Sequence, residues 1–422
     1  MVQEIGVTTS AEWSRCLRRL RSPVVMAPRH HGATRPMAVD FGARFQCGAG
    51  VDAGQNSTRA TRPVVRPARL GLIIGQLTAG GAEGQLWLLC RGLDRAAISP
   101  IVYCLSDQIE PYGPLITSAG VPLRIISGRR LARLQKLRRW LDADRIDVVH
   151  AWLFIANAYA WLANRAARRP LLTSARNCKR QGRVLDWLNR RAFAASHAIV
   201  TNSLQVAEYI EREYGAPRRR IRIIPNGIDT ERFHPRDGEA AEVAGPIVAA
   251  GRLVEQKNHA LFLRAAAGLA RLVPQAQFVI AGDGPLRSAL EEQARQLGIA
   301  DRVRFAGERR DIDTLLRAGS ILWLTSRWEG MPNIVLEAMA SGLPVITTDV
   351  GGVRELIRSG VDGFVVQEGD AGAFVRHSQE LLQPATRQLF AAAARARAEE
   401  FSTARMVSAL SQLYDKTLGR NH

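Results

Sequence analysis

Short apolar runs alternate with amphipathic stretches along most of the chain, beginning near residue 69. A short apolar run predicts a strand, and apolar residues spaced three and four apart predict a helix. Strands that alternate with helices are typical of βαβ units and a parallel sheet. In the first part of the chain, the pattern predicts strands at 70–74, 100–105, 123–126, 146–150, 171–175, 197–201 and 221–224, and helices near 82–93, 111–119, 129–142, 154–167, 183–194 and 204–214.

A polar, turn-rich segment interrupts this pattern, which then restarts. Pro225-Asn226-Gly227 favours a turn and 233–245 is polar, so we expect a linker near 226–245. The chain therefore predicts two doubly wound α/β domains in tandem, whose ligands bind at the carboxyl ends of the strands. In the second domain, strands are expected at 247–250, 277–281, 303–306, 321–325, 345–348 and 364–366, and helices at 259–272, 285–297, 311–318 and 333–340.

Residues 1–66 lack sustained apolar periodicity and predict a disordered extension, unless the true start is Met26 or Met37. We place the first domain at 67–235 and the second at 236–400. No apolar run approaches the roughly 18 residues of a membrane helix, which excludes an integral membrane protein. The start of the chain lacks the order of a signal peptide. The five cysteines are scattered without Cys-x-x-Cys spacing, so we expect a cytoplasmic protein with free thiols.

The net charge of +19 is concentrated in the first half of the chain. Residues 67–240 hold 27 basic and 15 acidic residues, whereas 241–422 hold 21 and 20. One interpretation is an anionic partner such as nucleic acid, an anionic bilayer or a phosphorylated acceptor, and the other is a solvated basic surface. The expected helix at 129–142 carries six basic residues and an imperfect apolar stripe. A membrane-surface helix and a helix packed on its own sheet therefore both stay open.

The densest group of polar residues follows the expected strand at 321–325. Pro332 suits the start of a helix, and such a start directs free N–H groups and a positive dipole end toward an anion. Glu329 precedes this start and Glu337 lies within the helix, so the two carboxylates can reach two parts of one extended ligand. The simpler interpretation is a solvent-exposed acid and a helix surface charge, because Glu-x7-Glu is a weak pattern.

Two basic residues follow the strand at 247–250. Arg252 and Lys257 suit a diphosphate, because guanidinium binds phosphate as a fork and ammonium as a point charge. An unspecific basic loop is the alternative.

Strand ends in the first domain supply weaker candidates. Gly80 and Gly81 follow the first strand and would let backbone approach a phosphate, although the residues alone favour a plain tight turn. His150 is expected to end the strand at 146–150, and Arg176 and Asn177 follow the strand at 171–175.

With these residues in view, the chain resembles the retaining glycosyltransferases of family 4. The resemblance rests on Gly-Gly-Ala-Glu at 80–83, Pro-Asn-Gly-Ile-Asp at 225–229, the segment 251–258, Ala-Gly-Asp-Gly-Pro at 281–285 and the segment 329–337. These motifs fall in the order and spacing of the family. The resemblance runs from about residue 70 to the end of the chain and does not include 1–66.

This resemblance implies the α/β GT-B fold, in which two Rossmann-like domains face each other across a cleft and a closing helix, here 401–422, returns to the first domain. The second domain would hold a nucleotide diphosphate sugar and the first would take the acceptor. No metal or other cofactor is expected, because Arg, Lys and a helix dipole would stabilise the leaving diphosphate. The implied donor-binding residues are Arg252, Lys257, Gly330, Met331, Pro332, Asn333, Glu337, Gly80 and Gly81; the implied catalytic residues are Glu329 and His150; Arg176 and Asn177 are acceptor candidates.

The implied reaction is transfer of the sugar with retention of configuration, by a front-face route in which Glu329 positions and stabilises. The basic first half favours a lipid-linked or polysaccharide acceptor of cell-surface glycan synthesis, at the inner membrane face and without nucleic acid. Trp152 stands where relatives often carry a second His, and Gly84 where a larger polar residue is common, which affects the acceptor. A nucleotide-sugar epimerase on the same fold and a non-catalytic basic protein that docks membrane or nucleic acid remain alternatives.

Overall fold

The computed structural model describes residues 66–236 and 245–420, and every structural statement below concerns these residues. The expected extension at 1–66 lies outside them except for Arg66, as do residues 237–244 of the expected linker and the thiols of Cys16 and Cys47. Cys90, Cys104 and Cys178 are free thiols. Across the described ranges, no helix is both long and apolar enough to cross a bilayer.

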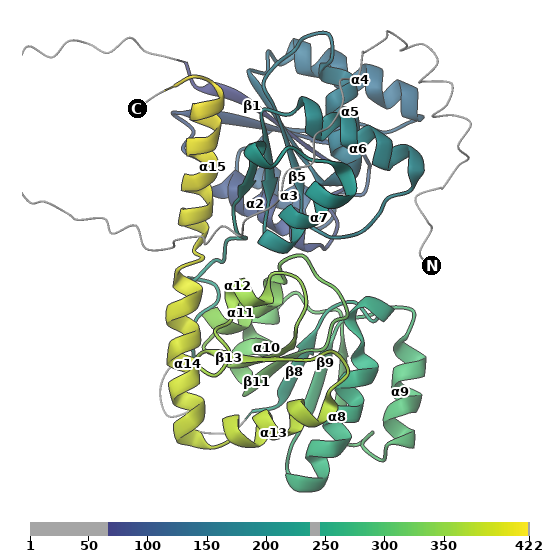
Figure 1. Cartoon of the computed structure of the whole chain (residues 1–422), viewed down its shortest axis with the longest axis vertical. Helices are drawn as coiled ribbons and strands as arrows, with labels where there is room; N and C mark the ends of the chain where they lie inside the picture. The colour runs from purple at the N-terminus through teal and green to yellow at the C-terminus, as the bar shows by residue number, and fades with distance from the viewer. Residues whose placement is uncertain (1–65, 237–244, 421–422) are drawn as a thin grey trace, which may run out of the picture. The chain divides into compact units, whose positions relative to one another are not determined.

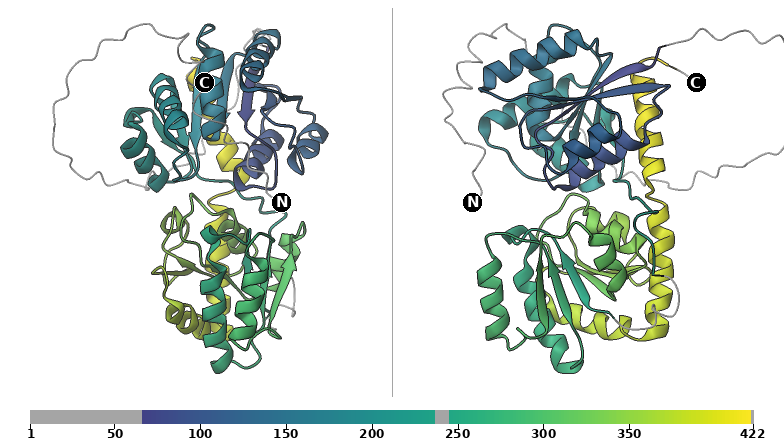
Figure 2. Two further views of the ribbon diagram at one scale, coloured as in Figure 1. Left: turned by 90° about the vertical axis from the view of Figure 1, so that its right-hand side faces the viewer. Right: turned by 180° about the vertical axis from the view of Figure 1, so that it is seen from behind.

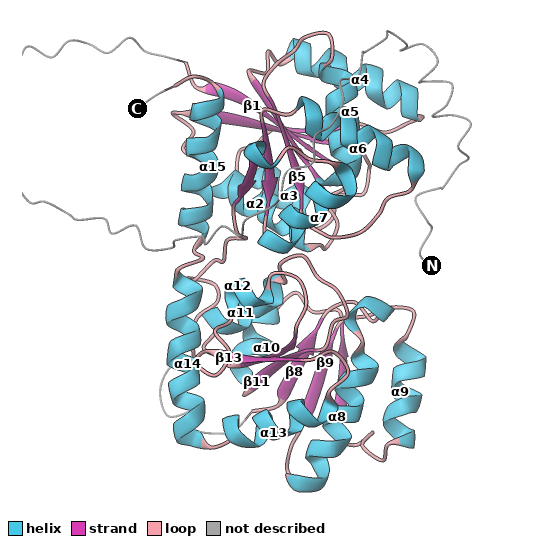
Figure 3. Ribbon diagram, viewed as in Figure 1, coloured by secondary structure: helices cyan, strands magenta, loops and turns pink. Residues whose placement is uncertain are grey.

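The first domain is built on a seven-stranded parallel sheet with the strand order β3-β2-β1-β4-β5-β6-β7 (Figures 1 and 3). Its order reverses between β1 and β4, which makes a topological switch point there. The strands are β1 (Ala68–Ile74), β2 (Ile98–Cys104), β3 (Leu123–Ile125), β4 (Val148–Trp152), β5 (Leu171–Ala175), β6 (Ala198–Thr201) and β7 (Ile221–Ile223). The helices are α2 (Gly81–Gly92), α3 (Tyr112–Ser118), α4 (Arg130–Ala143), α5 (Leu153–Asn164), α6 (Arg183–Ala195) and α7 (Leu204–Tyr214).

Alternate strand residues of this sheet face opposite helical layers. Leu70, Leu72 and Ile74 pack in one buried cluster with Leu86 and Leu89 of α2. On the other side, Ile199 packs with Phe154 of α5, Phe193 of α6 and Val206 of α7. Both faces are covered, which explains why the strands read as continuous apolar runs rather than alternating ones.

The second domain has a six-stranded parallel sheet with the order β10-β9-β8-β11-β12-β13, and its switch point lies between β8 and β11. Figure 3 shows helices on both sides of each sheet. The strands are β8 (Ile247–Ala250), β9 (Phe278–Ala281), β10 (Val303–Gly307), β11 (Ile321–Leu324), β12 (Val345–Thr348) and β13 (Gly363–Val366). The helices are α8 (His259–Leu272), α9 (Arg287–Gln296), α10 (Ile312–Ala318), α11 (Asn333–Ala340), α12 (Val353–Leu356) and α13 (Ala371–Leu381).

Two long helices end the chain. α14 (Pro384–Glu399) packs against α11, whereas α15 (Thr403–Thr417) packs against α2 of the first domain (Figure 2). The segment between them is fixed by the backbone of Ile228, whose N–H donates to Phe401 at 2.8 Å and whose carbonyl accepts from Thr403 at 3.0 Å. Met406, Leu410 and Tyr414 are buried in the core of the first domain. The last helix therefore belongs by packing to the domain that the chain began with.

The alternation of strands and helices predicted from the sequence is confirmed in both domains, although the bounds of many elements differ by one to three residues. The strand expected at 146–150 is wrong in its bounds, because β4 runs from Val148 to Trp152 and pairs with β1 as far as Ile74. Pro332 is the N-cap of α11 and not its first helical residue. None of α12, α13 and α14 was predicted from the sequence, although α13 and α14 are regular helices.

Candidate active site

The switch point of the second sheet brings two distant loops together. β8 ends at Ala250 and β11 at Leu324, and the two strands are hydrogen-bonded neighbours. Their loops leave the same edge of the sheet, so residues 72 positions apart meet there. Lys257 Nζ donates to Glu329 Oε1 at 2.6 Å, and both side chains are largely buried. This ion pair brings together the two groups that the sequence identified separately.

Three donors surround the Glu329 carboxylate. Besides Lys257, Ser326 Oγ donates to Oε1 at 2.7 Å, and Gln256 Nε2 lies 3.5 Å from Oε2. Gln256 and Lys257 come from one 3-10 turn (Glu255–Lys257), which Thr325 anchors by donating to the Lys257 carbonyl at 3.0 Å. The carboxylate is therefore fixed by hydrogen bonds and held ready to accept from hydroxyl groups.

Arg252 and Glu337 lie near this pair without direct contact to it. Arg252 is exposed, and no ion pair of its side chain is found in the described ranges, so the guanidinium is open to an anionic ligand. Glu337 lies within α11, one turn beyond Asn333. Burial raises the pKa of Glu337 to about 7, against the opposing charges of Arg232 and Lys257. The ionised carboxylate accepts hydrogen bonds, so hydroxyl groups that donate to it would favour its charged form.

The segment that enters α11 approaches the first domain through backbone. A Cβ on Gly330 would lie 2.1 Å from the carbonyl oxygen of Arg176, so only glycine permits this approach. Asn333 Nδ2 donates to the Gly81 carbonyl at 3.1 Å, and a Cβ on Gly81 would meet that same amide at 3.2 Å. Three residues singled out in the sequence, Gly81, Gly330 and Asn333, therefore lie close together.

Asn226 joins these segments, although the sequence placed it only in a turn and in the Pro-Asn-Gly-Ile-Asp motif at 225–229. Its Nδ2 donates to the Asn333 side chain at 2.7 Å and to the Met331 carbonyl at 3.1 Å. Its Oδ1 accepts from Arg176 Nη1 at 2.8 Å. The neighbouring Gly227 is held on α2 by both its backbone groups, which hydrogen-bond with Gln85. Its place in the Pro-Asn-Gly-Ile-Asp motif is the sequence signal that could have suggested this linking role.

Arg176 is buried against an aromatic ring, whereas Asn177 is only partly buried. The Arg176 guanidinium stacks 4.0 Å from the Trp152 ring, and burial lowers the pKa of Arg176 to about 9. Asn177 Oδ1 accepts a long hydrogen bond from the backbone of Lys179, at 3.4 Å. Their role as acceptor contacts stays a prediction.

Gly80 lies beside a buried carboxylate. Glu83 of α2 folds back over the helix start, so that a Cβ on Gly80 would lie 2.2 Å from its Oε2. Burial raises the pKa of Glu83, while the charges of Arg252 and Arg176 oppose this rise. Gly80 therefore leaves space for the Glu83 carboxylate, which interacts electrostatically with arginines of both domains.

His150 does not lie where the sequence placed it. Because β4 continues to Trp152, His150 is in mid-strand, fully buried and level with Leu72 and Leu172 of the neighbouring strands. Nδ1 lies 2.7 Å from the Tyr414 hydroxyl and Nε2 lies 2.7 Å from Ser174 Oγ. Burial, with help from Arg176, lowers the pKa of His150 to about 3, so the ring is neutral. Both ring nitrogens are engaged, and His150 here links β4 to α15; its contact with a sugar stays a prediction.

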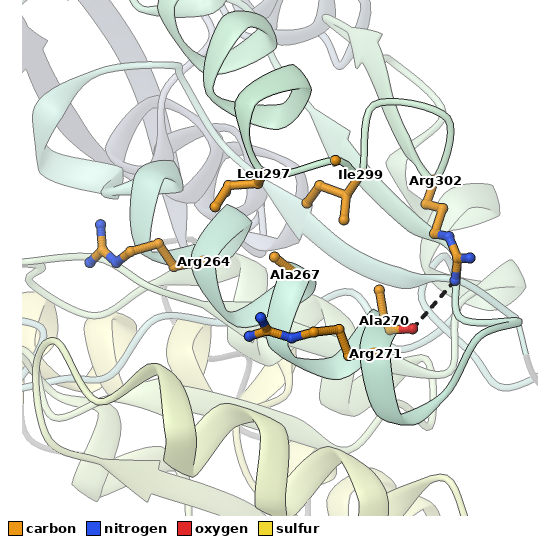
Figure 4. A pocket seen from close by; sticks show the side chains of 8 residues that line it. Arg264, Ala267, Ala270, Arg271, Leu297, Ile299 and Arg302 are labelled. Atoms are coloured by element: carbon orange, nitrogen blue, oxygen red, sulfur yellow. Dashed lines mark hydrogen bonds between the residues drawn. The ribbon is translucent and has the colours of Figure 1, made fainter.

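A separate hollow of about 420 Å³ lies in the second domain, between α8 and the end of α9. Arg264 and Arg271 of α8 and Arg302 surround it, and Arg302 donates to the Ala270 carbonyl at 3.5 Å (Figure 4). None of the residues predicted from the motifs lines it. The predicted residues instead gather at the carboxyl ends of the strands.

Comparison with known proteins identifies the family. The family described as Glycosyltransferase Family 4 matches residues 79–232, and the family described as Glycosyl transferases group 1 matches residues 233–397. A D-inositol 3-phosphate glycosyltransferase of Geodermatophilus obscurus is 31% identical over 306 residues, which is 65% of this chain and 67% of that protein. The UDP-Gal:alpha-D-GlcNAc-diphosphoundecaprenol alpha-1,3-galactosyltransferase of Escherichia coli is 27% identical over 330 residues, covering 70% and 85% of the two chains.

A solved structure shares the fold at low identity. Alr3699/HepE of Anabaena, crystallised in complex with UDP, superposes with a TM-score of 0.73 at 21% identity and covers 83% of this chain and 100% of its own. Two Rossmann-like parallel-sheet domains are thus common to this chain and to that structure. The chain belongs to the group 1 glycosyltransferases of family 4, which have the GT-B fold, and is a glycosyltransferase of glycan synthesis.

Proposed function

We propose that the chain transfers a sugar from a nucleoside diphosphate sugar to an acceptor, with retention of configuration and without a metal ion. The observation that carries this proposal is the Lys257–Glu329 pair of 2.6 Å at the switch point of the second sheet. An ammonium and a hydrogen-bonded carboxylate side by side fit the two halves of such a donor. The ammonium attracts a diphosphate and the carboxylate accepts from sugar hydroxyls.

The donor is held mainly by the second domain. Arg252 is exposed at the same loop as Lys257 and adds a second cation for the diphosphate. The backbone of Gly330, Met331, Pro332 and Asn333 leads into α11, and Glu337 follows for the ribose hydroxyls. Gly80 and Gly81 approach from the first domain. The crystallised complex of HepE with UDP and the name of the Escherichia coli relative support a uridine nucleotide.

Retention follows a front-face route. The bond from the anomeric carbon to the diphosphate oxygen breaks, and the acceptor oxygen forms its bond on the same face. The acceptor proton passes to the departing phosphate oxygen, so no protein nucleophile is used. The hydrogen bonds from Ser326 and Lys257 to Glu329 support a positioning role for that carboxylate. Arg252 and Lys257 stabilise the charge on the leaving diphosphate in place of a metal.

The acceptor is a lipid-linked or polysaccharide intermediate met at the cytoplasmic membrane face. The relative from Escherichia coli is named for a diphosphoundecaprenol acceptor, which is anionic and membrane-borne. The excess of 12 positive charges in residues 67–240 supports an anionic acceptor on the first domain.

The stereochemical proposal is tested without knowing the acceptor. Retaining transferases slowly pass the donor sugar to water, and the anomer that forms first shows the stereochemistry. Incubation with uridine, guanosine and adenosine diphosphate α-sugars, followed by proton NMR before mutarotation, is expected to show the α-anomer with one nucleotide. Release of the β-anomer contradicts retention. Conversion of the intact donor to an epimer contradicts transfer altogether.

A further inference from the structure

The loops that follow β1 and β2 lie side by side at the carboxyl edge of the first sheet, and Tyr112 ends the second loop. The two strands stop level with each other, since Ile74 pairs with Cys104. The carbonyl of Leu77 in the first loop accepts a hydrogen bond from the Tyr112 backbone N–H at 3.3 Å. Tyr112 is the first residue of α3, which packs against α2 (Figure 1). Tyr112 is therefore fixed at the edge where the candidate site lies, although none of the sequence motifs contains it.

The Tyr112 hydroxyl lies over a glycine of α2. A Cβ on Gly84 would lie 2.8 Å from the hydroxyl oxygen and 3.4 Å from Cζ, so the phenol occupies the space that a side chain would fill. Tyr112 is half-buried and packs against the core of the first domain, yet its hydroxyl makes no hydrogen bond to any residue of the described ranges. Buried polar groups are normally hydrogen-bonded, so this O–H is available to a ligand.

Glu337 of the second domain lies near this hydroxyl. Asn333 at the start of α11 donates to the Gly81 carbonyl at the start of α2 at 3.1 Å, so the two helix starts meet. Gly84 follows Gly81 by three residues, and Glu337 follows Asn333 by four. Residues three and four apart share one face of a helix. The Tyr112 hydroxyl and Glu337 therefore lie one turn beyond the contact between the helix starts, on its two sides.

The charges around the hydroxyl favour a neutral ligand group. Burial raises the pKa of Tyr112, and the carboxylates of Glu337 and Glu83 raise it further, while Arg232 opposes the rise. The phenol therefore stays protonated and can donate a hydrogen bond. Two carboxylates repel a phosphate at this place. A ligand hydroxyl, in contrast, can donate to a carboxylate and accept from a phenol at the same time.

We propose that Tyr112 binds a ribose hydroxyl of the nucleotide donor opposite Glu337, so that the first domain contributes to the nucleoside site. The ribose carries two hydroxyl groups on adjacent carbons, which can donate to Glu337 and accept from Tyr112. The inference rests on the proposed function, because only a protein that binds a nucleotide has a ribose to hold. It adds a residue to the site and a preference for ribonucleotides over deoxyribonucleotides.

Calorimetric titration of the full chain tests the proposal with uridine, guanosine and adenosine diphosphates and with the 2′-deoxy and 3′-deoxy counterparts of each. Tyr112→Phe is expected to weaken binding of the preferred ribonucleotide by about threefold to tenfold, which corresponds to one hydrogen bond. The loss is expected to disappear with the deoxy counterpart that lacks the hydroxyl bound by Tyr112. In that pair, the variant and the ligand remove the same contact, so the two losses do not add.

Gly84→Ala moves the hydroxyl without removing it, because the new Cβ would lie 2.8 Å from the hydroxyl oxygen. This variant is expected to weaken binding of the ribonucleotide as Tyr112→Phe does. The double variant Gly84→Ala/Tyr112→Phe is expected to bind no more weakly than Tyr112→Phe alone, because the close contact is with the hydroxyl. A further loss in the double variant would show that Gly84→Ala acts through the backbone and would count against the proposal.

Tyr209→Phe is the matched control, because it removes a hydroxyl from α7 in the buried cluster with Phe154 and Phe193. It is expected to leave nucleotide affinity unchanged, and melting temperatures establish that each variant is folded. Unchanged affinity in Tyr112→Phe, or equal losses with the ribonucleotide and both deoxy counterparts, overturns this inference and leaves the proposed function in place. Binding of none of the three ribonucleotides by the original protein contradicts the proposed function itself, and the inference with it.

Discussion

Glu337 has a carboxyl group whose pKa is raised to about 7, because burial outweighs the attraction of Arg232 and Lys257. Near neutral pH the free protein is therefore a mixture of protonated and ionised Glu337. Ribose hydroxyls donate to a carboxylate more strongly than to a carboxylic acid, so a bound nucleotide favours the ionised form. The affinity for the nucleotide is therefore expected to depend on the protonation of Glu337.

We expect nucleotide affinity to fall by up to about tenfold between about pH 8 and about pH 6, as Glu337 takes up a proton that the complex must release. Glu337→Gln removes this titration but keeps a hydrogen-bonding group. The phosphate of the nucleotide titrates in both proteins, so the difference between their pH profiles, measured by calorimetry, isolates Glu337. Parallel profiles would show that the carboxyl group does not meet the ligand.

The Glu329 carboxylate is fixed by hydrogen bonds from Ser326 and Lys257. A substitution of Glu329 therefore distinguishes a role in positioning from a role in binding the nucleotide. Glu329→Gln keeps the shape but loses the charge that pairs with Lys257. We expect nucleotide affinity to be retained or strengthened, because the ammonium is released for the diphosphate. We expect the rate of sugar release to fall by about 10²–10³-fold, as for other preorganised groups near a developing charge. An unchanged rate would remove Glu329 from the reacting centre.

His150 is neutral because burial holds its pKa at about 3, below the ordinary value of 6.5. The unfolded chain takes up a proton that the folded chain excludes, so this residue makes the protein less stable as the pH falls below about 6.5. Between about pH 7 and about pH 5 the effect is about 2 kcal/mol. His150→Gln is expected to lessen the pH dependence of the free energy of unfolding by that amount, measured by urea unfolding. If the free energy of unfolding depended on pH equally in the original protein and in His150→Gln, His150 would not be held neutral.

At the scale of elements, the loop before α11 is limited by the Arg176 backbone, since a Cβ on Gly330 would lie 2.1 Å from the Arg176 carbonyl oxygen. Gly330→Ala is therefore expected to lower the free energy of unfolding by about 1–3 kcal/mol and to weaken nucleotide binding. Gly372→Ala is the control, because Gly372 is exposed in α13 and a Cβ there meets no backbone, only the side-chain ends of Arg376 at 3.2 Å and Asp370 at 3.3 Å. The Gly372→Ala variant is expected to raise the free energy of unfolding by at most about 1 kcal/mol. Equal effects in both variants would contradict the close approach at Gly330.

The elements also show what the sequence could and could not predict. Apolar runs predicted the strands of both sheets, because buried parallel strands are apolar on both faces. The end of β4 was misplaced, because Ala151 and Trp152 continue the apolar run toward α5 and no turn residue marks the boundary. Lys257 and Glu329 were predicted as separate groups, and the switch point explains why they meet. The contacts of Asn226 with Met331 and Asn333 span more than a hundred residues, and no local pattern contains them.

At the scale of the whole molecule, the two domains differ in charge and in task. The first has the basic excess, whereas the second is nearly neutral and carries the Lys257–Glu329 pair. α15 packs with the first domain although it follows the second in the chain, and the backbone of Ile228 pairs with the segment before it. The connection after β7 and the return into α15 therefore lie side by side, which limits how the chain passes between the two sheets.

Calorimetric titration of the full chain with uridine, guanosine and adenosine diphosphates tests the central claim most directly. We expect one nucleotide to bind, and Lys257→Ala to weaken it by about 10–100-fold, because one charge-assisted contact is lost. Arg271→Ala, which removes an exposed cation of the same domain, is expected to leave the affinity unchanged. Binding of none of the three nucleotides, or equal losses in Lys257→Ala and Arg271→Ala, would contradict the assignment of the donor site.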